Sequence, residues 1–359
     1  MLIEDFFETK IISCGMTVAL ALVLLLAVSS MRQGGTKRAV RIPYAIASVA
    51  SLLAVTFFAG ACSPQTEESA RQLILQTNWA PQPEDGGFYH AQRTGMFEEK
   101  GISMKVRPAS AGMNIYTTVA AGDADFGISV LAKVLVAVDR GLPLKVISSY
   151  RPASLRVLLA HAEDPVESFE DLDGRLIKAR GEDLWLKYLI SEYDLDLRIL
   201  PHDFGIGQFV ARKDLIQQGL LTSEPFTLRE KGVPVKVLEL KEAGWKNMEV
   251  LFCREELLEA DPDLVSQVAS ICAEGWRGFL SEASAETLLF LAEENPARSI
   301  ESMRWAKEIL ASKYKAALEE GEDWLGPVDL EAAQGFAESL KEMGALSEGF
   351  ELESSFWSD

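Results

Sequence analysis

The sequence has few of the residues that build metal centres or disulfide frameworks. Its 359 residues include only three histidines, which are scattered, and four cysteines, so a histidine-rich metal site is not expected. Two cysteines lie in apolar N-terminal segments, which leaves Cys253 and Cys272 for the folded part. Without metal-type spacing, these two are either buried small apolar side chains or a single bridged pair. We expect no metal and no other cofactor.

Basic residues are also scarce relative to acidic ones. The chain has 35 Lys and Arg against 54 Asp and Glu, a formal net charge of −19. Such a negative field repels nucleic acid and anionic lipid headgroups, so DNA and RNA are not expected as partners. The field gives no general attraction to an anionic solute either, whose site would need local Arg side chains or helix N-termini.

Two long apolar runs stand near the N-terminus. Residues 11–30 contain no charged residue and are long enough to span a bilayer. A basic segment, 31–41, and a second apolar run, 43–61, then follow in the order of a secretory signal. The first run is either an additional membrane helix or a result of placing the start codon upstream of Met31.

The second apolar run ends in a sequence that resembles a bacterial lipobox. Its letters are AGACS at 59–63, with Ala59 where leucine is usual. The resemblance implies that Cys62 is lipidated and becomes the mature N-terminus, whereas the alternative is an uncleaved transmembrane helix. We expect residues 1–62 to be a signal or transmembrane segment and residues 63–70 a flexible tether. The protein would then be anchored to the cell membrane, facing the periplasm or the cell exterior.

From residue 71 onward, short apolar strands alternate with helices. Strands are predicted at 71–77, 102–108, 124–129 and 144–150, with helices at 88–99, 115–121 and 131–140 between them. A second series of strands is predicted at 175–179, 197–203, 219–224 and 235–240. Such alternation predicts an α/β fold with mainly parallel sheets flanked by helices.

The last third of the chain is predicted to be helical. Asp261 and Pro262 are the N-cap and first residue of one amphipathic helix, and Asp329 caps another. Two α/β units with a return to the first predict two lobes. We assign residues 71–158 and 245–359 to lobe 1 and residues 159–244 to lobe 2.

Several short motifs resemble the nitrate/sulfonate/thiamine-precursor family of substrate-binding proteins. They are NWAP at 78–81, GFY at 87–89, GMF at 95–97, GI at 101–102 and AGDADFGI at 121–128. QQG at 217–219 and TSEPF at 222–226 resemble one branch of that family. The resemblance, from about residue 72 to 345, implies a two-lobed periplasmic-binding-protein fold of type II. It also implies a monomer that delivers a small molecule to an ABC permease and its ATPase.

Within that family, the NW opening and the Glu-Pro pair look most like binders of thiamine pyrimidine precursors. We expect the ligand in a cleft at the carboxyl ends of the strands, where such sheets bind small molecules. Flat side chains there can sandwich a heteroaromatic ring, and a carboxylate can accept two N–H bonds from an aminopyrimidine. The candidate ligand-binding residues are Trp79, Tyr89, Tyr116, Tyr150, Trp185 and Glu224. Core packing is the alternative for each aromatic residue.

The charges near the expected cleft leave other ligands open. Glu182 and Asp183 stand at the expected start of the second lobe's first helix, where they disfavour a sulfonate or nitrate. Arg151 and Arg156 are able to meet an acidic group. Sulfonates, taurine, nitrate and riboflavin-like rings therefore remain alternatives.

The same family includes fungal enzymes that build the thiamine pyrimidine from their own histidine and pyridoxal phosphate. Those enzymes carry a histidine after the asparagine-tryptophan pair and a cysteine-rich run that holds iron. Here the matching position is most nearly Asp85, and no cysteine cluster exists. The sequence also lacks a Gly-Lys-Ser/Thr phosphate loop and a Gly-x-Ser-x-Gly nucleophile elbow. We expect no enzymatic activity and no catalytic residue; a sensory receptor is the remaining alternative.

Overall fold

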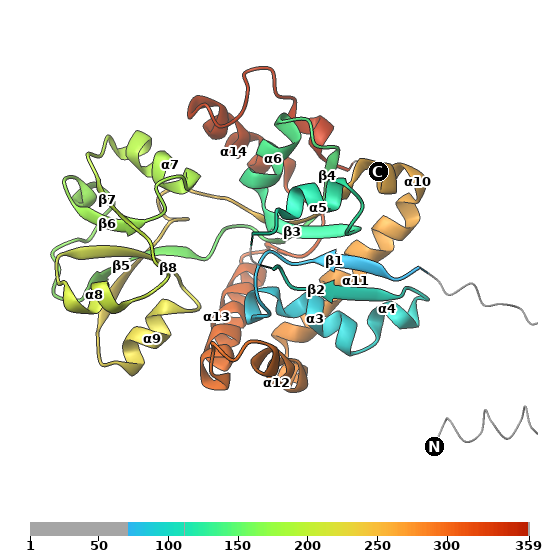
Figure 1. Ribbon diagram of the computed structural model, residues 1–359, viewed down its shortest axis with the longest axis horizontal. Helices are drawn as coiled ribbons and strands as arrows, with labels where there is room; N and C mark the ends of the chain where they lie inside the picture. The colour runs from blue at the N-terminus through green and yellow to red at the C-terminus, as the bar shows by residue number, and fades with distance from the viewer. Residues whose placement is uncertain (1–70, 111, 358–359) are drawn as a thin grey trace, which may run out of the picture. The chain divides into compact units, whose positions relative to one another are not determined.

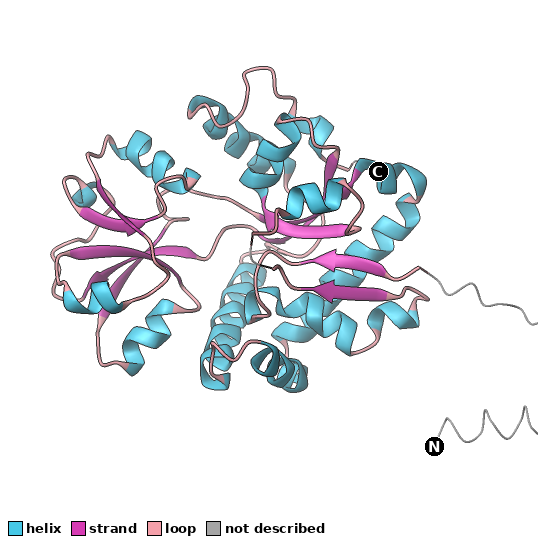
Figure 2. Ribbon diagram, in the orientation of Figure 1, coloured by secondary structure: helices cyan, strands magenta, loops and turns pink. Residues whose placement is uncertain are grey.

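The computed structural model describes residues 71–110 and 112–357. They form two α/β lobes with a five-stranded sheet in each (Figures 1 and 2). The expected signal segment, tether and lipidated Cys62 lie outside the described residues. Among the described helices, none combines the length and the apolar character needed to cross a membrane.

The first sheet is built from both ends of the folded part. Its order is β2 (Met104–Arg107), β1 (Leu73–Gln76), β3 (Phe126–Val130), β10 (Glu249–Arg254) and β4 (Leu144–Arg151). Strands β2, β1 and β3 run parallel, whereas β10 is antiparallel to both β3 and β4. The chain therefore leaves the first lobe after β4 and returns to it through β10.

The second sheet repeats this plan. Its order is β7 (Arg198–Pro201), β6 (Leu176–Ala179), β8 (Leu215–Leu220), β5 (Arg156–His161) and β9 (Val235–Glu239). Strands β7, β6 and β8 are parallel, and β5 is antiparallel to β8 and β9. The two-lobed α/β fold is as predicted, but both sheets are mixed because a strand next to a lobe crossing runs against its neighbours. The lobe boundary expected after residue 158 falls inside β5.

Helices cover both faces of the first sheet (Figure 1). On one face lie α5 (Ile115–Ala120), α6 (Leu131–Asp139) and α14 (Leu330–Glu342). On the other lie α3 (Gly86–Arg93), α4 (Met96–Glu99), α10 (Glu255–Ala260), α11 (Pro262–Leu280), α12 (Ala285–Glu294) and α13 (Ile300–Glu319). In the second lobe, α7 (Leu184–Tyr193) packs on one face, and α8 (Gly207–Ala211) and α9 (Glu224–Glu230) on the other. Short 3-10 turns are η1 (Pro83–Asp85), η2 (Glu170–Leu172), η3 (Glu282–Ser284) and η4 (Leu352–Ser355).

The contact between α3 and α11 in the first lobe follows from local sequence. The Asp261 side chain accepts a hydrogen bond of 3.0 Å from the Leu264 amide, which caps α11 as predicted. The predicted apolar stripe of α11, including Trp276, is buried. Gly87 lies against it, and a Cβ there would come within 2.2 Å of the Trp276 ring. This glycine of the GFY motif therefore allows close packing of the two helices.

Two elements differ from the sequence-based expectation. The helix predicted at 88–99 is divided into α3 and α4 at Gly95, whose φ is +78°. The strand predicted at 219–224 instead covers 215–220, and α9 begins at Glu224. Pro225, which has no amide proton, stands in the first turn of that helix, where none is needed.

The two cysteines of the folded part are buried free thiols in the first lobe. Burial raises the pKa of the Cys253 thiol to about 12. This agrees with their interpretation as small apolar side chains. Within residues 71–110 and 112–357, no group of three or more His, Cys, Asp or Glu side chains is arranged to hold a metal ion.

Candidate functional site

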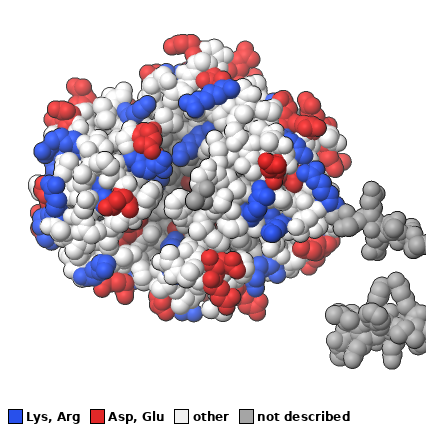
Figure 3. All heavy atoms as spheres, viewed as in Figure 1, with Lys and Arg blue, Asp and Glu red and all other residues white. Residues whose placement is uncertain are grey.

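Loops from both lobes meet where parallel strands end. Trp79 follows β1 and Phe204 follows β7, and their ring centroids lie 6.1 Å apart. Lys133, in the first turn of α6, lies close enough to Arg180 and Asp183, which follow β6, for their charges to act on its pKa. Figure 3 shows a groove between the lobes, with Lys and Arg side chains along its upper part. Because open α/β sheets bind ligands at such carboxyl ends, this interlobe cleft is the candidate site.

The cleft holds charged side chains of both signs. Lys133 has an exposed surface, yet the surrounding protein desolvates its ammonium group and lowers its pKa, an effect that Asp183 opposes. Arg156, at the start of β5, is half-buried; desolvation lowers its pKa, and Asp183 and Glu249 oppose this change. Partial exposure together with strong desolvation is expected of side chains that line a cleft. Two cations with accessible surface thus lie near the Asp183 and Glu249 carboxylates, which are themselves largely buried.

Glu224 lies at the edge of this charged group. It begins α9, and its Oε2 accepts a hydrogen bond of 2.7 Å from the Leu220 amide. A Cβ on Gly219 would come within 3.1 Å of the same oxygen, so the carboxylate folds back over the end of β8. Burial raises the pKa of Glu224, and the Leu220 hydrogen bond and the charge of Arg156 oppose the rise. Since Oε2 already accepts one hydrogen bond within the protein, Oε1 is the freer acceptor for a ligand.

Two of the predicted aromatic residues retain accessible surface. Trp79 is 53% exposed, in the loop after β1. Tyr116 is half-buried; its hydroxyl lies 2.7 Å from the Ser129 Oγ, and its ring stacks on Phe252 with centroids 5.9 Å apart. Burial raises the pKa of Tyr116, so the hydroxyl stays protonated and able to donate. Trp79 therefore offers a ring face, and Tyr116 a hydroxyl fixed by Ser129.

The other three predicted aromatic residues are buried: Tyr89 is 2% exposed, Tyr150 4% and Trp185 3%. The Tyr150 hydroxyl donates to Oε2 of Glu249 at 3.3 Å, and Nε1 of Trp185 donates to Oδ2 of Asp183 at 3.1 Å. Tyr150 and Trp185 therefore help to orient the Glu249 and Asp183 carboxylates. Tyr89 packs against the first lobe's core, and direct ligand contact by any of the three stays a prediction.

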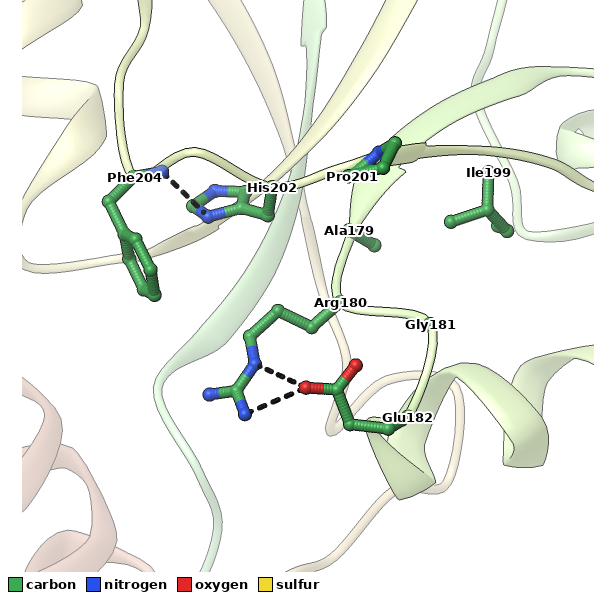
Figure 4. A pocket seen from close by; sticks show the side chains of 8 residues that line it. All are labelled: Ala179, Arg180, Gly181, Glu182, Ile199, Pro201, His202 and Phe204. Carbon is green, nitrogen blue, oxygen red and sulfur yellow. Dashed lines mark hydrogen bonds and ion pairs between the residues drawn. The ribbon is translucent and has the colours of Figure 1, made fainter. Parts of the chain in front are cut away.

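A pocket of about 580 Å³ lies at the carboxyl ends of β6 and β7 (Figure 4). Arg180 donates to Oε1 of Glu182 from Nε at 3.1 Å and from Nη2 at 2.9 Å. The lining residues are Ala179, Arg180, Gly181, Glu182, Ile199, Pro201, His202 and Phe204. The pocket thus combines an apolar wall with one ion pair.

A buried polar contact joins the lobes beside the cleft. Nη1 of Arg298 donates to both carboxylate oxygens of Glu84, at 3.1 and 2.9 Å, and Nη2 donates to the Thr222 carbonyl at 2.7 Å. The Thr222 hydroxyl also donates to Glu84. Glu84 and Arg298 belong to the first lobe and Thr222 to the second, so this interlobe contact holds the lobes together. A second ion pair, between Lys313 and Glu239, spans 2.9 Å between α13 and β9.

Asp85 lies next to the interlobe contact and is buried. Within the part of the chain that the structure describes, its Oδ2 has no hydrogen-bond partner. Burial raises the pKa of Asp85 well above its usual value, the charge of Arg151 opposes the rise, and Glu84 and Glu249 add to it. Arg151 instead pairs with Glu249 at 3.6 Å and donates to the Glu84 carbonyl at 3.0 Å. Asp85 is therefore a buried acid with one carboxylate oxygen that lacks a partner among the described residues.

A family model described as NMT1/THI5 like matches residues 82–283, more than half of the chain. The chain belongs to this family. The family resemblance seen in the sequence motifs is thereby confirmed.

Among curated proteins, this family member is similar to the 4-amino-5-hydroxymethyl-2-methylpyrimidine phosphate synthase of Schizosaccharomyces pombe. The two are 24% identical over 133 residues, which cover 35% of this chain and 38% of the synthase. The match therefore spans little more than a third of that relative.

Solved structures share the fold over most of their length. The periplasmic aliphatic sulphonate binding protein SsuA of Escherichia coli has a TM-score of 0.63 at 14% identity, covering 81% of this chain and 93% of its own. The ligand-binding component of an ABC-type import system from Staphylococcus aureus has a TM-score of 0.56 at 11% identity, covering 80% and 96%. At these identities the likeness shows the fold, and it confirms the predicted periplasmic-binding-protein architecture.

Sequence reasoning did not identify Phe204 or Lys133 as residues of the cleft. Phe204 stands three residues after a strand, the same signal that pointed to Trp79 after β1. Lys133 is the only Lys or Arg of helix α6, whose other residues are apolar except Asp139 at its end, a pattern that was available in the sequence. The Glu84–Arg298 pair joins residues 214 positions apart, and nothing local in the sequence predicts it.

Proposed function

We propose that this chain is an extracytoplasmic solute-binding protein of an ABC importer, which holds a small heteroaromatic molecule between its two lobes. The observation that carries this proposal is the convergence of strand-end loops from both sheets around charged groups and the exposed ring of Trp79. Family membership supports it, as does the fold shared with a ligand-binding component of an import system. A pyrimidine precursor of thiamine is the ligand we propose, because a relative is named as a pyrimidine phosphate synthase.

The charges of the cleft support an aminopyrimidine. Its ring nitrogens can accept from Arg156 or Lys133, and its amino group can donate to the Glu224 or Asp183 carboxylate. A sulfonate is the second candidate, because Lys133, Arg156 and Arg180 are cations near the cleft and a structural neighbour is named as a sulphonate binder. A sulfonate would leave the Glu224 and Asp183 carboxylates facing a like charge.

We propose binding without catalysis. An acid, Asp85, occupies the position that resembles the enzymes' histidine, and burial favours its neutral form. Pyrimidine synthesis is the alternative that the named relative supports. Incubation of the protein with pyridoxal phosphate, iron and oxygen, followed by mass spectrometry of the small molecules, should give no pyrimidine product.

We further propose that Cys62 is lipidated and anchors a monomer at the cell membrane, where the lobes meet an ABC permease and its ATPase. Cys62→Ala should block processing, leave a larger precursor and abolish labelling by a palmitate analogue. Equal labelling of the wild type and the variant would contradict the anchor without affecting the proposed ligand.

Thermal-shift screening of the full chain in detergent tests the proposed function. The test set contains 4-amino-5-hydroxymethyl-2-methylpyrimidine, riboflavin and taurine. A ligand at 100 times its dissociation constant should stabilise the folded protein by about 2.7 kcal/mol. Stabilisation by the pyrimidine supports the thiamine-precursor proposal, and stabilisation by taurine alone supports the second candidate. No stabilisation by any of the three would contradict the proposed function.

A further inference from the structure

Phe204 has an exposed ring on a conformationally unusual backbone. Its side chain is 64% exposed, the largest fraction among the exposed large apolar residues of the described chain. Its φ is +61°, a left-handed value found in the described residues at only one other non-glycine position, Asp194. For a bulky aromatic residue this conformation is strained and persists only where the surroundings enforce it. The ring is therefore held out toward solvent at a cost to stability.

A buried lysine holds this conformation in place. Lys178, on β6, is fully buried, and its Nζ donates to the Gly205 carbonyl at 2.9 Å and pairs with Asp203. The Gly205 amide donates to Oδ1 of Asp203 at 2.9 Å. Burying an ammonium group costs free energy unless it is paired, and here both of its partners belong to the 203–205 turn. Lys178 thus secures the residues on either side of Phe204.

His202 completes the support, as Figure 4 shows. Its Nδ1 accepts a hydrogen bond of 3.1 Å from the Phe204 amide. An imidazole nitrogen accepts only in its neutral form, and desolvation followed by the charge of Lys178 lowers the pKa of His202. These contacts fix the turn, whereas the Phe204 ring meets the edge or face of His202, with centroids 5.1 Å apart, and otherwise keeps most of its surface exposed.

The Phe204 ring faces the other lobe. Trp79, the most exposed aromatic residue of the first lobe, lies 6.1 Å from Phe204 between ring centroids, with 35° between the ring planes. A flat molecule between two rings needs two contact gaps of about 3.5–4.0 Å, or about 7–8 Å in all. The two rings would have to separate by only about 1–2 Å to admit one. Because each ring belongs to a different lobe, a small opening of the cleft is enough.

We propose that Trp79 and Phe204 form an aromatic clamp for a flat aromatic ligand, with Lys178 as the positioning residue that holds Phe204 in the clamp. This inference rests on the proposed solute-binding function and deepens it, since it names the two rings that would hold an aromatic ligand and the residue that positions one of them. Arg180 and Glu182 of the adjoining pocket would face polar substituents at the ring edge.

Two substitutions of Phe204 separate the effect of its ring from the effect of its backbone conformation. Asn adopts left-handed conformations more readily than most residues, so Phe204→Asn removes the ring and spares the turn, and Phe204→Tyr keeps both. Calorimetry on the full chain uses 4-amino-5-hydroxymethyl-2-methylpyrimidine, riboflavin and taurine as probes. Phe204→Asn should weaken binding of the ring probes about tenfold, and Phe204→Tyr should change it less than about twofold. Taurine binding should be unchanged in both.

The positioning role is tested in a double-mutant cycle. Asp203→Ala removes the carboxylate partner of Lys178 at an exposed position, and the melting temperature of the ligand-free variant shows whether it folds as the wild type does. Asp203→Ala should weaken binding of the ring probes about three- to tenfold in the wild-type background, yet have no further effect in the Phe204→Asn background. A general loss of structure would instead lower affinity in both backgrounds and would contradict the positioning role.

The outcomes distinguish this inference from the proposed function. If the wild type binds a ring probe and Phe204→Asn binds it equally well, the clamp is wrong and solute binding stands. If the wild type binds taurine alone, the ring assignment is wrong and solute binding stands. If the wild type binds none of the probes, the proposed function itself is contradicted, and the clamp with it.

Discussion

The two lobes share one strand plan but are covered differently. In the first lobe the long helices α11 and α13 close over a core with large aromatic side chains such as Phe88, Trp276 and Phe279. The same position in the second lobe is covered by the short helices α8 and α9 over five buried apolar side chains. These five are Val157, Leu159, Phe209, Leu215 and Leu228.

The lobes also bring different groups to the cleft. Besides the exposed Lys133 and Trp79, the first lobe contributes Glu84 and Arg298, whose charges already have partners. The second contributes loops at the surface, with Arg180 beside Glu182 and the exposed ring of Phe204. Regions with few buried apolar contacts open at lower free energy than the core. We infer that the first lobe is the stable base and that the second adapts to the ligand.

The largest difference between the lobes should appear in their cores. Trp276→Ala should lower the free energy of unfolding by about 3–5 kcal/mol, because it empties the contact between α3 and α11. Phe209→Ala should cost less, since α8 is short and its small cluster can collapse. Urea unfolding followed by circular dichroism measures both. An equal or larger loss of unfolding free energy in Phe209→Ala would contradict the proposed difference between the cores of the two lobes.

Loss of the interlobe contact between Glu84 and Arg298 should have the next largest effect. Arg298→Met leaves Glu84 buried without its cation, which costs about 3–5 kcal/mol while the lobes stay closed. Opening lets Glu84 reach water, so we expect a larger radius of gyration in X-ray scattering and at least about tenfold weaker ligand binding.

Lys313→Met is the matched control for Arg298→Met. Its pair with Glu239 also joins the lobes but is partly exposed on both sides, so its loss should cost no more than about 1 kcal/mol. Scattering curves that do not change in Arg298→Met would show that other contacts keep the lobes closed.

Glu224 tests what the second lobe contributes to ligand choice. In Glu224→Gln the amide oxygen can keep the hydrogen bond to the Leu220 amide and turn the NH2 group toward the ligand. Pyrimidine binding should weaken by about 1.5–3 kcal/mol, the range for a hydrogen bond to a charged group, whereas taurine binding should stay equal or tighten. Calorimetry with both ligands decides, and unchanged pyrimidine affinity would remove Glu224 from the site.

The pH dependence of the free energy of unfolding tests the role of the buried Asp85 in the first lobe. Its pKa in the folded protein is raised above the usual 3.8, so the folded state holds a proton that the unfolded chain has lost. Its contribution to stability is complete below pH 3.8 and is lost as pH rises through the folded-state pKa.

Asp85→Asn removes this titration with little change of shape. Between the two pKa values, the wild type should lose up to about 1.4 kcal/mol per pH unit relative to the variant. Unfolding free energies of both proteins from pH 3 to pH 8 measure this difference. Parallel curves would show that Asp85 is ionised and solvated in the folded protein.

Much of the fold followed from local sequence. The strand and helix alternation, the cap at Asp261 and the buried stripe of α11 all reflect short-range periodicity and capping. The order of strands in each sheet did not follow, because it depends on contacts between distant segments. Gln217 and Gln218 lie buried in β8, whereas the strand was predicted to begin four residues after Leu215.

The candidate site was predictable only where exposure followed from position. Trp79 stands in a loop directly after a strand, and the structure leaves it exposed there. Tyr89 lies on a short helix, and the sequence does not show which side of that helix α11 covers. Phe204 depends on the turn that Lys178 holds, and a buried lysine is not visible in a local pattern.

The central claim is that a flat ligand binds between the lobes against Trp79. Because this ring is exposed, Trp79→Ala should leave the melting temperature of the ligand-free protein nearly unchanged. Calorimetric titration with 4-amino-5-hydroxymethyl-2-methylpyrimidine should show binding to the wild type, weakened by at least about 1 kcal/mol in Trp79→Ala. Equal affinity of the two proteins, or a large loss of ligand-free stability in the variant, would contradict the account.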